Sequence, residues 1–203
     1  MKSLIKNALI LFVITLVAGA ALGFVYNITK EPIEEAARKA EEAAYKEAFP
    51  DGAVFEDLSE QGRMPEYTNT DEKYKNINID KTVLVKDSGN EILGYILIVT
   101  TSEGYKNNTI TMSVGITTDR ILRGITFLKL TETAGLGMRA EEVIKPQFVN
   151  GTATEYTVTK LPKTDDSQIE AISGATITSK GVTNAVNACL SYFDEALGGG
   201  TYQ

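Results

Sequence analysis

The feature that most constrains this chain is a long uncharged segment near its N-terminus, residues 7–29. Because about 20 helical residues cross the hydrocarbon core of a bilayer, this segment predicts one transmembrane helix. Lys2 and Lys6 precede it, whereas acidic and basic residues are mixed from Lys30 onward. Cytoplasmic flanks carry an excess of Lys and Arg. We therefore expect residues 1–6 in the cytoplasm and the C-terminal domain outside the cell (inner) membrane.

A cleaved secretory signal is the alternative for this segment. Ala18, Gly19 and Ala20 are small, as a signal-peptidase site requires. The apolar run continues to Tyr26, which is longer than a usual signal core. This length favours an uncleaved, single-pass anchor.

Composition divides the rest of the chain into three parts. Residues 30–49 are rich in Ala, Glu and Lys, with Pro32 suited to a first turn, and they predict a helical linker. Residues 50–198 suffice for one globular domain, in which the stretch to about Ile79 is polar and loop-like. Glycines at 198–200 end the last helix and lead into a tail, residues 199–203.

The domain sequence predicts an α+β fold with antiparallel strands. Strand patterns occur at residues 82–85, 92–100, 109–117, 121–129 and 155–158, and a short helical piece is expected at 141–148. An amphipathic C-terminal helix is indicated by apolar residues at helical spacing: Val182, Ala185, Val186, Cys189, Leu190, Phe193 and Leu197.

The sequence contains no histidine, no tryptophan and one cysteine, Cys189. One thiol without an imidazole cannot build an iron–sulfur cluster or a typical zinc site, or a Ser-His-Asp or Cys-His catalytic group. We therefore expect no metal site and no catalytic residue, a buried Cys189, and an organic cofactor for any redox function. The net charge of −7 argues against a nucleic-acid partner.

The segment best suited to hold a ligand is Ser-Gly-Ala-Thr-Ile-Thr-Ser, residues 173–179, directly before the C-terminal helix. Free backbone N–H groups and the positive end of the helix dipole favour a phosphate at a helix start. Gly174 permits close approach of the backbone. Alternatively, Thr178 or Ser179 only caps the helix, and local chemistry alone favours this simpler role.

The same segment resembles the flavinylation motif of the FMN-binding domain family, Asp-x-x-Ser/Thr-Gly-Ala-Thr. The resemblance implies covalent FMN with its phosphate bonded to Thr176, and it places Glu170 where the family more often has Asp. It also implies cofactor contacts by the neighbouring residues of the segment: Ser173, Gly174, Ala175, Ile177 and Thr178.

A second segment, Glu-Thr-Ala-Gly-Leu-Gly at residues 132–137, resembles the Glu-Thr-Pro-Gly-Leu-Gly loop of the same family, with Ala134 in place of proline. Two glycines around a leucine would let backbone approach a planar ring. The alternative is a tight turn after a strand. The resemblance adds these cofactor-binding residues: Glu132, Thr133, Gly135, Leu136 and Gly137.

With its span, the Thr-Lys-Glu-Pro-Ile-Glu-Glu-Ala segment at 29–36 and an alanine-rich helix ending at Phe49, the whole chain resembles the G subunits of Rnf electron transport complexes. The resemblance implies a non-catalytic subunit that relays electrons through FMN in an ion-translocating ferredoxin:NAD oxidoreductase. It also implies partners: other membrane and peripheral Rnf subunits, especially the flavinylated D subunit, and a flavin transferase for maturation.

Three alternatives remain. The C subunit of sodium-translocating NADH:quinone reductase shares the flavin motif but is typically longer. An anchored binding or scaffold module would use residues 173–179 only as a helix cap. A stand-alone extracytoplasmic flavoprotein reductase would turn over a substrate as an isolated domain.

Overall fold

The computed structural model describes residues 2–60, 62–65 and 72–198. The chain divides into two compact units, Met1–Ala40 and Glu41–Gln203, and helix α1 (Lys2–Ala48) contributes residues to both. The predicted tail at 199–203 lies outside the described residues.

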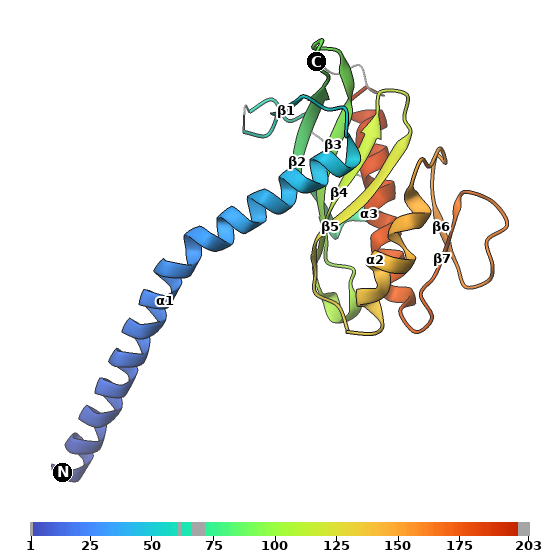
Figure 1. The fold of residues 1–203 in the computed structure, drawn as a ribbon. Coiled ribbons are helices and arrows are strands. Elements are labelled where there is room, and N and C mark those ends of the chain that lie inside the picture. The colour runs from blue at the N-terminus through green and yellow to red at the C-terminus, as the bar shows by residue number, and fades with distance from the viewer. Residues whose placement is uncertain (1, 61, 66–71, 199–203) are drawn as a thin grey trace. The chain divides into compact units, whose positions relative to one another are not determined.

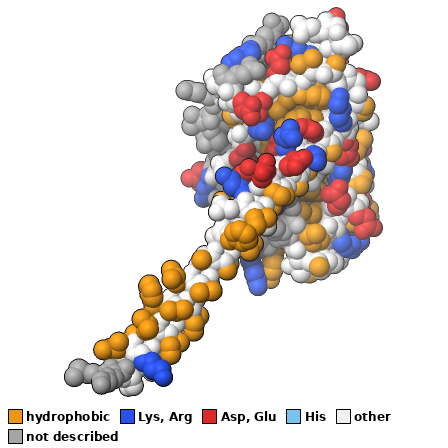
Figure 2. Space-filling view, turned by 60° about the vertical axis from the view of Figure 1, so that its left-hand side comes forward, with side chains coloured by type: hydrophobic (Ala, Val, Ile, Leu, Met, Phe, Trp, Pro, Cys, Tyr) orange, Lys and Arg blue, Asp and Glu red, His pale blue; other side chains and the backbone are white. Residues whose placement is uncertain are grey.

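In the first unit, α1 carries apolar side chains around its surface (Figure 2). The helix is long and apolar enough to cross a membrane, and its apolar window is not buried by the rest of the protein. Water disfavours apolar surface of this extent, whereas the hydrocarbon core of a bilayer accommodates it. The large exposed residues include Leu9, Leu11, Phe12, Ile14, Leu16 and Val17.

α1 does not begin anew near Pro32, as the first-turn prediction required, because Pro32 lies inside the helix. A proline there removes one N–H group and the hydrogen bond that it would donate to the carbonyl four residues earlier. The alanine-rich sequence that follows has high helix propensity. The change near residue 30 is therefore one of composition and not a break in the helix.

The second unit is built on an antiparallel sheet whose five strands lie side by side in sequence order (Figure 1). The predicted meander is therefore confirmed. The strands are β1 (Val54–Asp57), β2 (Ile77–Lys86), β3 (Ile92–Thr101), β4 (Ile110–Thr117) and β5 (Leu122–Leu130).

The prediction of a loop from residue 50 to about Ile79 is wrong in two places. β1 lies within that stretch, and β2 begins at Ile77. The short β1 segment, Val-Phe-Glu-Asp, gives little alternation to recognise. It becomes a strand through antiparallel pairing, with Val54 opposite Lys86.

β3 is buried on both faces, because side chains alternate between the two sides of a strand. Tyr95, Leu97 and Val99 belong to the main core, which also contains the apolar face of helix α3 (Thr176–Glu195). The opposite face of β3 belongs to a smaller cluster with the end of α1 and with β2: Tyr45, Phe49, Val83, Val85, Ile96 and Ile98. The sheet is therefore the middle layer of this unit.

Short elements connect the sheet to α3. The predicted helical piece appears as α2 (Ala140–Val143) between the 3₁₀ turns η3 (Gly137–Arg139) and η4 (Lys145–Phe148). The predicted strand near 155–158 appears as β6 (Thr157–Thr159), which pairs in parallel with β7 (Gln168–Glu170). β7 was not predicted from the sequence, because its three residues are too few to show an alternation of apolar and polar positions.

The predicted amphipathic C-terminal helix is confirmed as α3, and all of its predicted apolar residues are buried. Burial raises the pKa of the Cys189 thiol far above its usual value, so this cysteine is a core residue. On the same helix, Asn187 Oδ1 accepts a hydrogen bond from Tyr156 N, and Asn187 Nδ2 donates one to Tyr156 O, each at 2.8 Å. This pair holds the segment before β6 against α3.

We expect Asn187→Ala to lower the free energy of unfolding by about 2–4 kcal/mol, because it leaves the buried N–H and C=O groups of Tyr156 unpaired. Urea denaturation of the full chain in detergent micelles measures the loss. Lys180→Ala, at an exposed position of the same helix, is the control and should change stability by less than about 0.5 kcal/mol. Equal stability of the two variants would contradict this role of Asn187.

Candidate functional site

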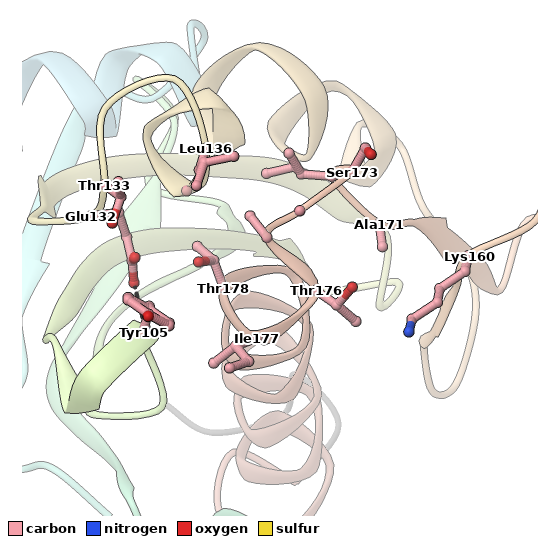
Figure 3. Close-up of a pocket in the computed structure, with 14 residues that line it drawn as sticks. Tyr105, Glu132, Thr133, Leu136, Lys160, Ala171, Ser173, Thr176, Ile177 and Thr178 are labelled. Atoms are coloured by element: carbon pink, nitrogen blue, oxygen red, sulfur yellow. Dashed lines mark hydrogen bonds between the residues drawn. The ribbon is translucent and has the colours of Figure 1, made fainter.

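A pocket of about 700 Å³ lies between the loop after β5, the segment after β7 and the first turn of α3 (Figure 3). Small-molecule and cofactor sites commonly have volumes of about 300–1,000 Å³. Every predicted site residue except Gly135 lines this pocket. The lining residues are Tyr105, Glu132, Thr133, Leu136, Gly137, Lys160, Ala171, Ile172, Ser173, Gly174, Ala175, Thr176, Ile177 and Thr178.

The two predicted segments touch each other, although about 40 positions separate them in the sequence. A Cβ atom added to Gly174, whose φ is +79°, would lie 3.1 Å from Leu136 Cδ2. A Cβ atom added to Gly137 would lie 2.8 Å from Thr178 Oγ1 and 2.7 Å from Glu132 Oε2. Glycine at both positions therefore permits the loop to close on the start of α3.

The loop at 132–137 is a tight turn as well as a wall of the pocket. Thr133 O accepts hydrogen bonds from Leu136 N at 3.1 Å and from Met138 N at 3.2 Å. Gly135 has a φ of +75°, and an added Cβ would meet nothing within 4 Å. Gly135 therefore contributes to the site through its backbone conformation, because it lets the chain turn and present Leu136 to the pocket.

The start of α3 has no side-chain cap. Its N-cap residue, Ala175, makes no side-chain capping bond, and the first backbone bond of the helix runs from Ser179 N to Ala175 O at 3.0 Å. Ser179 Oγ instead accepts from Ile172 N and donates to Ala175 O. The alternative in which Thr178 or Ser179 only caps the helix is therefore not what the described residues show.

Several backbone N–H groups consequently converge on the pocket without a partner in the described part of the chain. These belong to Thr176, Ile177 and Thr178, in the first turn of the helix. An uncapped helix start directs both these donors and the positive end of the helix dipole toward a ligand. An anionic group, above all a phosphate, is the ligand that this geometry favours.

Charged side chains lie at opposite sides of the pocket (Figure 3). Lys160, just beyond β6, lies on the same side as Thr176, and the described residues place no carboxylate in an ion pair with it. Glu132 lies on the other side, where its Oε1 accepts a hydrogen bond from Tyr105 N at 2.9 Å. The positive charge thus lies on the Thr176 side of the pocket, and the negative charge lies on the side of Tyr105 and Thr178.

Four lining residues were not predicted from the sequence, namely Tyr105, Lys160, Ala171 and Ile172. Tyr105 and Lys160 stand far from both motifs, and no pattern around them indicates a site. Glu170, the acidic position of the motif, does not line the pocket. Its Oε1 accepts a hydrogen bond from Lys163 N at 2.9 Å and so stabilises the connection between β6 and β7.

Two family models match this chain. Residues 104–191 match the FMN-binding domain, a range that includes both pocket segments. Residues 1–48 match the RnfG N-terminal region, a range that includes all of α1.

Relatives match the chain over most of its length. The G subunit of the Na(+)-translocating ferredoxin:NAD(+) oxidoreductase complex of Acetobacterium woodii is 32% identical, over 95% of this chain and 92% of that protein. The G subunit of the ion-translocating oxidoreductase complex of Pasteurella multocida is 28% identical, over 93% of each. The crystal structure of Shewanella oneidensis NqrC aligns with a TM-score of 0.48 and 18% identity, over 62% of this chain and 63% of that one.

The chain belongs to the family of G subunits of Rnf-type ion-translocating oxidoreductase complexes.

Proposed function

We propose that this subunit carries FMN bound covalently to Thr176 through a phosphoester and relays electrons through it within an Rnf-type complex. One observation carries the proposal. Thr176 is the first residue of the 20-residue helix α3, at an uncapped helix start that opens into a pocket of about 700 Å³. The match of residues 104–191 to the FMN-binding domain supports the choice of cofactor.

The phosphate end of the cofactor fits the helix start. Thr176 is only half-buried, so its hydroxyl is accessible for esterification. The unpaired N–H groups of the first turn would donate hydrogen bonds to the phosphate oxygens. Lys160 would supply a positive charge from the same side of the pocket.

The ring end of the cofactor fits the apolar part of the pocket. Leu136 is 42% exposed and Ile177 is 52% exposed, so both present apolar surface that a ring would cover. Glycine at 137 keeps the backbone close to this surface. When bound, FMN supplies the one- and two-electron chemistry that the side chains of this protein lack.

Attachment of FMN requires a separate enzyme, because a threonine hydroxyl is a poor nucleophile without a base. Glu132 is the carboxylate among the lining residues, and it lies across the pocket from Thr176 (Figure 3). We propose a transferase that uses FAD. The hydroxyl oxygen of Thr176 would attack the phosphorus on the FMN side, AMP would leave, and the proton would pass to a base of the transferase.

The apolar helix anchors the subunit in the cell membrane, with residues 1–6 in the cytoplasm and the FMN domain outside. The proposed orientation rests on Lys2 and Lys6, which precede the uncharged span. Proposed partners are the membrane and peripheral Rnf subunits, especially the flavinylated D subunit. A tethered cofactor suits such an assembly, since covalent attachment keeps its local concentration high outside the cell.

Thr176→Ala should abolish covalent flavin when the chain is coexpressed with the transferase. In-gel flavin fluorescence after denaturation and intact mass measure the loss, and the wild type should gain the mass of FMN less one water. Thr178→Ala, two residues along the same helix, is the matched control and should remain flavinylated. Fluorescence in the Thr176 variant but not in the Thr178 variant would contradict the assignment.

Gly137→Ala should alter the environment of the flavin more than its attachment. The new methyl group would meet Glu132 and Thr178, so it would displace the loop from the ring site while Thr176 stays at the helix start. We expect shifted flavin absorbance at nearly unchanged flavin content. Gly89→Ala, in the turn between β2 and β3, should leave both quantities as in the wild type. Identical spectra for the two variants would show that the loop is only a turn.

Cysteine labelling tests the orientation, because native Cys189 is buried. A membrane-impermeant maleimide should label Thr164→Cys, an exposed position of the domain, in intact spheroplasts. Ser3→Cys should react only after permeabilisation, and intact mass should include Met1. The reverse labelling pattern would overturn the orientation, and a chain that starts near Ala21 would overturn the uncleaved anchor.

A further inference from the structure

One aromatic residue at the pocket, Tyr105, belongs to a turn with an unusual backbone conformation. Tyr105 opens the 3₁₀ turn η2 (Tyr105–Asn107), in which Lys106 and Asn107 have φ values of +56° and +61°. Two successive non-glycine residues in the left-handed region are strained, and such strain persists only where the surroundings enforce it. This turn is therefore held in place by its neighbours.

Glu132 is the neighbour that holds the turn. Its Oε1 accepts a hydrogen bond from Tyr105 N at 2.9 Å, across 27 positions of sequence. The contact is close, because any Cβ atom on Gly104 would overlap both Glu132 Oε1 and Asn108 O. Gly104 N also donates to Asn108 O at 3.1 Å and closes the turn.

The second carboxylate oxygen of Glu132 lowers the stability of the fold in this arrangement. Glu132 Oε2 is buried and has no hydrogen-bond partner in the described part of the chain. An unpartnered buried oxygen of a carboxyl group destabilises the fold. The stability of the fold therefore does not explain why a glutamate is at position 132. Its contact with Tyr105 must serve another purpose.

The Tyr105 side chain itself contributes little to the fold. It is 44% exposed. In the described residues its hydroxyl makes no hydrogen bond and its ring pairs with no aromatic ring, although Lys106 Nζ lies 5.5 Å from the ring centroid. It does line the pocket, on the side opposite Thr176 and Lys160 (Figure 3). A strained turn thus presents an aromatic ring to a ligand site.

We propose that Tyr105 is the aromatic wall on which the flavin ring stacks, and that Glu132 is the positioning residue that holds Tyr105 there. This inference rests on the proposed attachment of FMN to Thr176. Leu136 and Ile177 lie between Thr176 and Tyr105 in the pocket (Figure 3), so a cofactor fixed by its phosphate at Thr176 would reach Tyr105 by passing them. Offset stacking of two rings is favourable beyond the burial of their area.

Flavin fluorescence tests the stacking. A tyrosine in contact with an excited flavin quenches it, since one electron passes from the phenol ring to the flavin and then returns. In the flavinylated full chain in detergent, Tyr105→Leu should raise the fluorescence per bound flavin several-fold. Tyr105→Phe should also raise it, because phenylalanine is a poor electron donor, but should leave the flavin absorbance near that of the wild type.

Tyr26→Leu is the matched control for the loss of a tyrosine. Tyr26 is 63% exposed and does not line the pocket, so its replacement should leave the fluorescence unchanged. If Tyr105→Leu is as dim as Tyr26→Leu while equally flavinylated, Tyr105 does not contact the ring and the inference is overturned.

Two variants of Glu132 test its positioning role. Glu132→Ala removes the acceptor for Tyr105 N and should raise the fluorescence although Tyr105 is still present. Glu132→Gln keeps an acceptor oxygen and should stay as dim as the wild type. If Glu132→Ala is as dim as the wild type, or if Glu132→Gln is as bright as Glu132→Ala, the positioning role is overturned.

Denaturing gels separate this test from that of the proposed function. Flavin retained on the wild type and on every variant, with fluorescence unchanged in the native state, would overturn only the role of Tyr105 and Glu132. A wild type without covalent flavin would overturn the proposed attachment itself, and the stacking with it. Should Glu132→Ala fail to fold in a thermal unfolding assay, the Tyr105 variants still decide the stacking, and a Glu132→Gln variant as bright as Tyr105→Leu would overturn the positioning role.

Discussion

Burial of one face of α3 against the sheet determines where the candidate site lies. The apolar residues of this helix belong to the main core, together with inward residues of β3 and β4. A buried hydrogen bond of 3.1 Å between Thr82 Oγ1 and Tyr192 Oη ties β2 to the same helix. Since a helix is rigid over this length, packing its body fixes its first turn, and Thr178 is thereby placed beside Gly137 of the loop after β5.

The start of α3 lacks a stabilising side-chain cap among the described residues, and this leaves backbone N–H donors free for a ligand. The N-cap residue, Ala175, has no side-chain acceptor, and Ser179, which lies one turn inside the helix, bonds Ile172 and Ala175. The donors of the first turn therefore stay available, at the cost of the stabilisation that a cap provides. The contact of Glu132 with Tyr105 also lowers fold stability, because it leaves Glu132 Oε2 buried without a hydrogen-bond partner among the described residues. Both features suit a site that is completed by its cofactor.

Much of the fold could be predicted because its elements carry a strong local pattern. The meander and α3 follow from alternation and from helical spacing, which depend on residues close together in the sequence. β1 and β7 were missed because they are short and owe their existence to pairing with β2 and β6. The alternative role of Thr178 or Ser179 as a helix cap is not observed, because α3 begins at Thr176 and both residues lie inside the helix.

The sequence by itself determined the apolar span, the α+β class and the two segments at 132–137 and 173–179, because each is local. Only the tertiary structure decided that these segments touch, through Leu136 on Gly174 and Thr178 beside Gly137. It also brought Tyr105 and Lys160 to the same pocket. The physical reason is that local patterns fix the elements, whereas packing of the sheet against α3 fixes the distances between residues remote in the chain.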